Sequence, residues 1–109
     1  MRRIALIFMG LAGMAQAESW SDLNGAEIAA ALNEQTLQYE DATQVFYESG
    51  RTLYDAGRPS WGYWAVRGDQ YCSQWPPADG WACYDMQRNG DVLRFIGESG
   101  HATDGVLTR

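Results

Sequence analysis

From Thr36 onward, aromatic and β-branched residues alternate with polar ones. This two-residue period is typical of β-strands that bury one face. Short turn signals interrupt the alternation and separate six stretches of strand length: 44–48, 51–55, 61–67, 70–75, 81–88 and 91–97. The pattern predicts an antiparallel meander of six or seven strands, and it leaves open whether the sheet closes into a partial barrel.

One segment before the strands is typical of a helix. Asn24 and Glu27 have the spacing of a capping box, and good helix formers follow them up to Leu32. Ile28, Ala31 and Leu32 fall on the same helical face. We therefore expect a short amphipathic N-terminal helix that packs against the sheet, in a fold that is mainly β (small α+β).

The first seventeen residues have the three-part layout of a secretory signal peptide. A basic start, Met1–Arg3, precedes an uncharged apolar run, Ile4–Met14, which is too short to span a bilayer as a helix. No cysteine stands at the lipoprotein position, so we expect no membrane anchor. The sequence predicts cleavage between Ala17 and Glu18, a single domain over 18–109, and a periplasmic or secreted location.

Two-residue loops predict how neighbouring strands align. A loop at 89–90 places Met86 opposite Leu93. The same register brings Asp85 opposite Arg94, where the two side chains would form a cross-strand ion pair.

The cysteines are expected to form a disulfide, because an exported pair in a small domain is usually oxidised. With Cys72 opposite Cys83, the middle hairpin places Gln74 opposite Trp81. All the hairpins then place one set of residues on a common face, and a one-residue slip would reverse that face. We expect this set to form the core: Trp64, Val66, Tyr71, Trp75, Ala82, Tyr84, Met86, Leu93 and Phe95.

The charge of the chain excludes some classes of function. It has 14 Asp and Glu against 8 basic residues, a net charge of −6, and all the basic residues are arginines. A nucleic-acid-binding protein needs a basic surface, so we expect no nucleic-acid partner. Attraction to an anionic membrane surface is disfavoured for the same reason.

Catalytic and metal-binding patterns are missing from the sequence. Ser99, His101 and Asp104 are the residue types of a hydrolase triad, but they are crowded into one glycine-rich stretch, which we expect to be a solvated loop. A single His and two bonded Cys cannot supply a zinc site, and no calcium-binding loop is present. The sequence predicts no cofactor and no enzymatic activity.

Aromatic residues supply the candidate binding site. Tyr63 and Trp81 fall on the face opposite the predicted core, and Gln74 lies between them in the same cross-strand row. Exposed rings on a sheet can stack on a sugar or anchor a protein. We therefore predict an exported, non-catalytic binding or protein-interaction module for an envelope protein, a glycan or a small ligand. An envelope structural or stress protein without a discrete ligand is the alternative, followed by a small hydrolase.

Part of the chain resembles a known family. The residues that carry the resemblance are Gly62-x-Trp64-x-Val66-x-Gly68-Asp69-x-Tyr71-Cys72-x-x-Trp75, then Trp81-x-Cys83-Tyr84 and a Gly90-Asp91 turn. This pattern is similar to that of small secreted bacterial proteins grouped as domain of unknown function 995, and the likeness covers roughly residues 24–97. It implies the same fold, export and disulfide, and it implies no activity.

Overall fold

The structure is a computed structural model that describes residues 19–108. The predicted signal peptide, 1–17, and its cleavage site between Ala17 and Glu18 lie outside these residues. Within the described range, no helix is long and apolar enough to cross a membrane.

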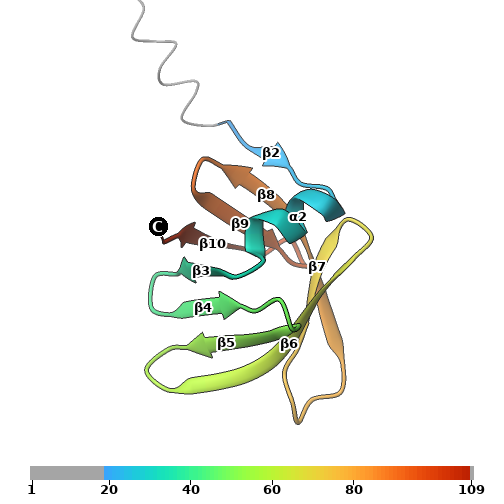
Figure 1. Cartoon of the computed structure of the whole chain (residues 1–109). Coiled ribbons are helices and arrows are strands. Elements are labelled where there is room, and N and C mark those ends of the chain that lie inside the picture. Colours follow the sequence, from blue (N-terminus) through green and yellow to red (C-terminus); the bar gives the residue numbers. More distant parts are fainter. Residues whose placement is uncertain (1–18, 109) are drawn as a thin grey trace, which may run out of the picture.

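Eight antiparallel strands form a closed barrel in simple up-and-down order (Figure 1). Each strand pairs with the next one along the chain, and the last pairs back with the first. The barrel strands are β3 (Gln35–Gln38), β4 (Thr43–Phe46), β5 (Arg51–Asp55), β6 (Pro59–Arg67), β7 (Gln70–Gln74), β8 (Trp81–Asn89), β9 (Val92–Ile96) and β10 (Ala102–Leu107). A two-residue strand, β2 (Ser21–Asp22), pairs with the end of β8 outside the ring. The predicted fold, mainly β with one helix and one disulfide, is confirmed.

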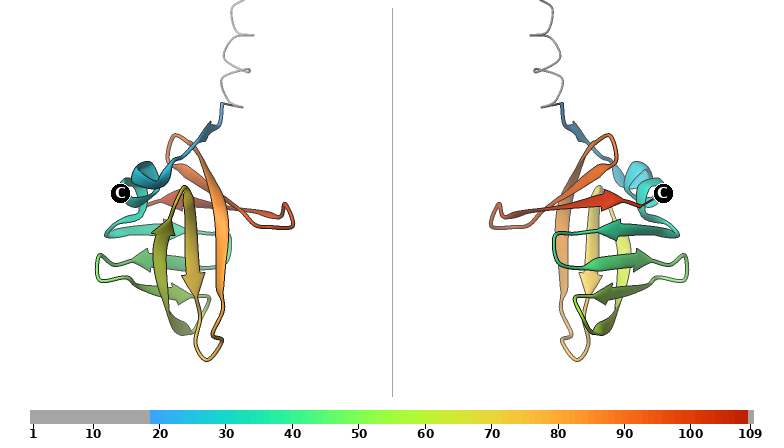
Figure 2. Two further views of the ribbon diagram at one scale, coloured as in Figure 1. Left: turned by 90° about the vertical axis from the view of Figure 1, so that its right-hand side faces the viewer. Right: turned by 90° about the vertical axis from the view of Figure 1, so that its left-hand side faces the viewer.

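One helix, α2 (Gly25–Leu32), covers one end of the barrel (Figures 1 and 2). The predicted capping box is present: the Glu27 N–H donates to Asn24 Oδ1, and the Asn24 N–H donates to Glu27 Oε1, both at 2.9 Å. The Gly25 N–H donates to Asp69 Oδ1 at 2.8 Å, which ties the start of the helix to the turn between β6 and β7. The face of α2 that was expected to pack on the sheet is buried, and its residues Ile28, Ala31 and Leu32 belong to the core.

The core fills the half of the barrel beneath α2. Its strand residues are Leu37, Phe46, Trp64, Tyr71, Met86, Leu93, Phe95 and Leu107. The predicted core face is thus largely confirmed, with Val66 and Tyr84 partly buried against it. Ala82 and Trp75 are the exceptions: Ala82 is exposed, because β8 begins beyond the packed half of the barrel, and Trp75 is only half-buried and lies outside the core cluster.

The disulfide is as predicted, and so are the register between β6 and β7 and the register between β7 and β8. Trp64 lies opposite Ser73, and Gln74 lies opposite Trp81. Cys72 and Cys83 are bonded across β7 and β8, with their Cα atoms 4.0 Å apart.

The predicted register of the last hairpin is wrong by two residues. Met86 lies opposite Phe95, because the loop is Gly90-Asp91 and Asn89 stays in the strand. Gly90 supplies the left-handed conformation (φ 61°) that the first loop position requires, as Gly68 (φ 60°) does in the β6–β7 turn. Since the shift is even, every side chain keeps its face.

The predicted ion pair between Asp85 and Arg94 is wrong for the same reason. Asp85 lies opposite Ile96, and Arg94 binds Asp104 on β10, with Nε 2.8 Å from Oδ1.

None of the six predicted stretches covers β2, β3 or β10. The glycine-rich stretch expected to be a loop ends at β10, which closes the barrel by pairing with both β9 and β3. Its inward positions are Thr103, Gly105 and Leu107, so only one of the three shows an apolar side chain in the alternation. Gly105 is required there because a Cβ would lie 2.8 Å from the ring of Tyr39.

Candidate functional site

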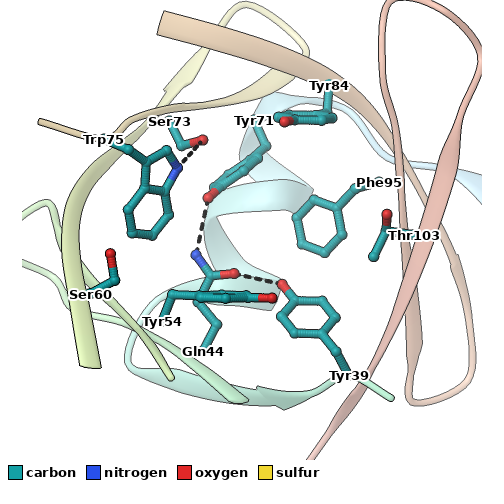
Figure 3. A pocket seen from close by; sticks show the side chains of 10 residues that line it. All are labelled: Tyr39, Gln44, Tyr54, Ser60, Tyr71, Ser73, Trp75, Tyr84, Phe95 and Thr103. Carbon is teal, nitrogen blue, oxygen red and sulfur yellow. Dashed lines mark hydrogen bonds between the residues drawn. The ribbon is translucent and has the colours of Figure 1, made fainter. Parts of the chain in front are cut away.

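The end of the barrel opposite α2 contains a cavity of about 420 Å³ (Figure 3). Every barrel strand contributes to the wall of this cavity. The contribution of β3 is the residue that follows it, Tyr39. In Figure 3 the side chains surround a common space, and α2 lies behind them. The lining residues are Tyr39, Gln44, Tyr54, Ser60, Tyr71, Ser73, Trp75, Tyr84, Phe95 and Thr103.

The cavity wall is aromatic and polar without being charged. Six of the ten lining residues carry rings, and the other four carry hydroxyl or amide groups. None of these ten described residues has an acidic or basic side chain. Broad ring faces and hydrogen-bonding groups thus line the same space.

Gln44 organises the polar part of the wall. The Tyr39 hydroxyl donates to Gln44 Oε1 at 2.7 Å, and Gln44 Nε2 donates to Thr52 Oγ1 at 2.9 Å and to the Tyr71 hydroxyl at 3.4 Å. The Thr52 hydroxyl in turn donates a hydrogen bond to the Val45 carbonyl at 2.8 Å. Because Gln44 is only 5% exposed, these bonds hold its amide in one orientation.

The Trp75 ring lies against the cavity wall because the facing position on β6 is a glycine, Gly62, which has no side chain. A Cβ on Gly62 would lie 2.5 Å from the Trp75 ring, so glycine at this inward position makes room for the indole. The indole N–H donates to Ser73 Oγ at 3.2 Å, and the ring meets Tyr54 edge-on, with centroids 6.1 Å apart.

Burial disfavours ionisation of two of the tyrosine hydroxyls. It raises the pKa of Tyr71 to about 12, although hydrogen bonds from Ser73 and Gln44 lower it in part. Burial also raises the pKa of Tyr39 well above its usual value, and the neighbouring tyrosines add to the effect. Both groups therefore stay protonated to a higher pH than tyrosine does in the unfolded chain.

We expect the protein to lose stability above pH 10. The two tyrosines ionise near pH 10.0 in the unfolded chain but at higher pH in the folded protein, so the stabilisation is complete below pH 10 and is lost as pH rises toward the folded pKa. The loss is at most about 1.4 kcal/mol per pH unit for each tyrosine. Urea unfolding at pH 8, 10 and 11 measures it. In a Tyr71→Phe variant the free energy of unfolding should fall less steeply with pH. An unchanged slope in that variant would contradict the role given to the Tyr71 hydroxyl.

The predicted binding row, Tyr63, Gln74 and Trp81, lies on the outer wall of the barrel and not in the cavity. The register places the three side by side across β6, β7 and β8. Tyr63 is 43% exposed and Trp81 is half-buried. The row is therefore assembled as a surface, and its role in binding stays a prediction.

Arginines cover part of the rings on this outer row. The Arg67 guanidinium lies 4.2 Å from the centroid of the Trp81 ring, and that of Arg51 lies 5.6 Å from the Tyr63 ring. Gln74 Nε2 donates to the Asp79 carbonyl at 2.7 Å, inside the loop between β7 and β8. These contacts give the exposed rings structural partners on the protein itself.

The cavity residues were missed because their strands were interpreted only as core. The alternation predicts a packed interior for Tyr71, Tyr84 and Phe95, and it does not distinguish Tyr39 or Gln44. The usable signal was Gln44, a polar residue at an inward position of an alternating strand, since buried polar groups need defined partners.

Two of the three triad-type residues have surroundings that the structure describes in detail. Asp104 is held by Arg94 at 2.8 Å, and His101 is exposed in the turn between β9 and β10. Among residues 19–108 no group of three or more His, Cys, Asp or Glu could hold a metal ion.

No protein-family model, curated protein or solved structure matches this chain. The resemblance to the domain of unknown function 995 proteins therefore stays a prediction.

Proposed function

We propose that this chain is an exported, non-catalytic binding protein that holds one uncharged, ring-bearing ligand in the open end of its barrel. The observation that carries the proposal is the cavity of about 420 Å³, lined by rings and by uncharged hydrogen-bonding groups. Small-molecule sites are typically concave spaces of about 300–1,000 Å³ with a few fixed polar groups among apolar ones.

The ligand should be uncharged because the described lining residues offer no opposite charge. Burying an ionised group without a partner of opposite charge is costly, and none of the ten described lining residues has an acidic or basic side chain. Ring faces of Trp75 and Phe95 favour a flat or sugar-like ring, and the hydroxyls of Tyr54 and Tyr84 suit hydroxyl or amide substituents. Glycosides and similar neutral ring compounds have this chemistry.

A ligand site explains the two-part interior of the barrel. An eight-stranded barrel can be filled by side chains or can hold one small ligand. Here large apolar residues fill the half under α2, whereas the opposite half keeps an open space. An envelope structural protein would gain nothing from such a space, because unfilled volume costs packing energy.

Export is supported by two observations. The Cys72–Cys83 disulfide is typical of oxidising compartments. The amino-terminal layout of a signal peptide at 1–17 agrees with it, and we place the mature protein in the periplasm or outside the cell.

The outer row of Tyr63, Gln74 and Trp81 is a second candidate surface, for a larger partner such as an envelope protein or a glycan chain. The alignment of two large rings across three strands favours it. Its arginine contacts would have to be displaced before the covered ring faces could bind.

Filling the cavity should weaken ligand binding. Ser60 is exposed at the rim of the cavity, so we expect Ser60→Trp to fold and to place an indole into the space. The probe is phenyl β-D-glucoside, and its binding to the protein is measured by calorimetric titration. The unmodified protein should bind it, and Ser60→Trp should weaken binding at least about tenfold, the effect of about 1.4 kcal/mol.

The matched control is Ser49→Trp, which makes the same substitution in the exposed turn at the α2 end of the barrel. It should bind as the unmodified protein does. Equal binding by all three proteins would place the site elsewhere, and phenyl β-D-glucuronide, which carries a carboxylate, should bind to none of them.

A further inference from the structure

Strand β8 changes partners half-way along its length. Its first part pairs with β7 on one side, and its second part, Asp85–Asn89, pairs with β9 on the other. The ladder to β9 ends where Asp85 faces Ile96, because the chain then turns away at Gly97, whose N–H donates to the His101 carbonyl at 2.9 Å. On the β9 side, no strand in residues 19–108 pairs with the segment 81–84.

The disulfide shows which backbone groups this free edge presents. Directly opposed residues in an antiparallel pair alternate between hydrogen-bonded and non-hydrogen-bonded positions, and the Cα atoms are closer in the latter. The Cα separation of 4.0 Å identifies Cys72 and Cys83 as a non-hydrogen-bonded pair. The N–H and C=O groups of Trp81 and Cys83 therefore point away from β7, toward the free edge.

A surface groove runs along this edge. It lies between the start of β8 and the turn of the β9–β10 hairpin, which projects sideways from the barrel in Figure 2. Asp85 and Glu98 are its acidic lining residues. Tyr84 and Thr103 line both the groove and the barrel cavity, so the two spaces adjoin.

We propose that the free edge of β8 binds an extended, basic peptide segment of another polypeptide by strand addition. Backbone hydrogen bonds to Trp81 and Cys83 would supply the pairing, as in other proteins that recognise peptides at a sheet edge. Alternate side chains of the added strand would point outward, beside the carboxylate of Asp85, and inward, toward the mouth of the cavity. The segment therefore alternates Lys or Arg with apolar or ring-bearing residues.

The acidic groove favours a basic peptide over a second copy of this chain. Two β8 edges paired about a twofold axis would gather the Asp85 and Glu98 carboxylates of both copies around one interface, and the described groove lining has no Lys or Arg to offset them. Like charges at a sheet interface are destabilising. A basic segment places opposite charges there instead.

A blocked, fluorescein-labelled peptide Lys-Tyr-Lys-Val-Lys is the probe, and fluorescence anisotropy with the disulfide-bonded protein is the measurement. We expect saturable binding, no binding of the matched Glu-Tyr-Glu-Val-Glu peptide, and at least tenfold weaker binding of the peptide that is N-methylated at one of the two alternate sets of residues. Of the two alternate N-methylation patterns, only the one that removes the N–H groups facing β8 should be harmful. Equal affinity for both patterns would overturn strand addition.

A pair of protein variants isolates one backbone group. Trp81→Pro removes the N–H at the first residue of β8, where proline is tolerated, and Trp81→Ala removes the indole but keeps that N–H. The peptide should bind about fivefold more weakly to Trp81→Pro than to Trp81→Ala. If Trp81→Pro does not fold, the two N-methylation patterns on unmodified protein decide the question.

Two further results separate this inference from the cavity ligand and from a dimer. Ser60→Trp should leave the backbone-dependent binding of the peptide in place even where it weakens binding of phenyl β-D-glucoside. Sedimentation should show a monomer before the peptide is added. A dimer that the peptide must dissociate would assign the edge to a second copy and overturn the proposal.

Discussion

A chain that ends at His101 should fail to fold. The shortened chain lacks β10, the strand that pairs with β9 at five positions and joins β3 at Leu37. It also lacks Leu107, which is 4% exposed in the core, and truncating one buried leucine to alanine already costs about 2–5 kcal/mol. Losing that side chain and both ladders together should exceed the net stability of a small domain, about 5–15 kcal/mol.

Circular dichroism and urea unfolding measure the effect of this truncation. The control is a chain that ends at Thr108, beyond the last strand residue, and it should unfold as the full chain does. A chain ending at His101 that retains a cooperative unfolding transition would show that the barrel does not depend on closure by β10.

Replacing Trp64 by alanine should cost about 3–5 kcal/mol of folding free energy, whereas replacing Trp81 should cost about 1 kcal/mol or less. Trp64 is 9% exposed, meets the ring of Phe46 edge-on at 5.7 Å, and donates its indole N–H to the Tyr47 carbonyl at 2.9 Å. Trp81 lies on the outer wall, and its ring contact is with the Arg67 guanidinium. An exposed contact of this kind contributes about 0.5–1 kcal/mol.

Urea unfolding of the two variants makes this comparison at one temperature and one pH. Similar losses in both would mean that the outer row is structural, and the row would then be withdrawn as a candidate binding surface. A small loss in Trp81→Ala would leave that row free to serve binding.

The sequence predicted those parts of the fold where several local signals agree. The helix was predictable because the capping residues Asn24 and Glu27 and the apolar face from Ile28 to Leu32 point to the same start and period. The hairpin between β6 and β7 was predictable because Gly68-Asp69 supplies its turn. An error of two residues in the last hairpin left the core face intact, since sheet faces alternate with a period of two.

Barrel closure could not be predicted because it depends on contacts between residues far apart in the chain. Gly105 weakens the strand signal of β10, yet glycine is required there because Tyr39, which follows β3 far earlier in the chain, lies over it. The sequence near residue 105 gives no signal that the ring lies there.

The cavity could not be predicted because it depends on how much of the barrel interior the side chains fill. The inward positions of Tyr71, Tyr84 and Phe95 are the same whether the barrel is filled or open. Only the packing of all eight strands and α2 shows that the apolar residues fill one half and leave space in the other. The outer row, by contrast, follows from the register alone, and this is why the sequence located it and not the cavity.

The indole N–H signal of Trp75 tests the binding site most directly. Trp75 lies in the cavity wall, whereas Trp61 and Trp81 lie on the outer surface, so ¹⁵N-labelled indole resonances distinguish the two locations. Loss of one resonance in Trp75→Phe assigns the signal. Titration with phenyl β-D-glucoside should shift the Trp75 resonance in a saturable way and leave those of Trp61 and Trp81 in place. Saturable shifts of Trp61 and Trp81 with an unmoved Trp75 would contradict the cavity site and assign binding to the outer wall.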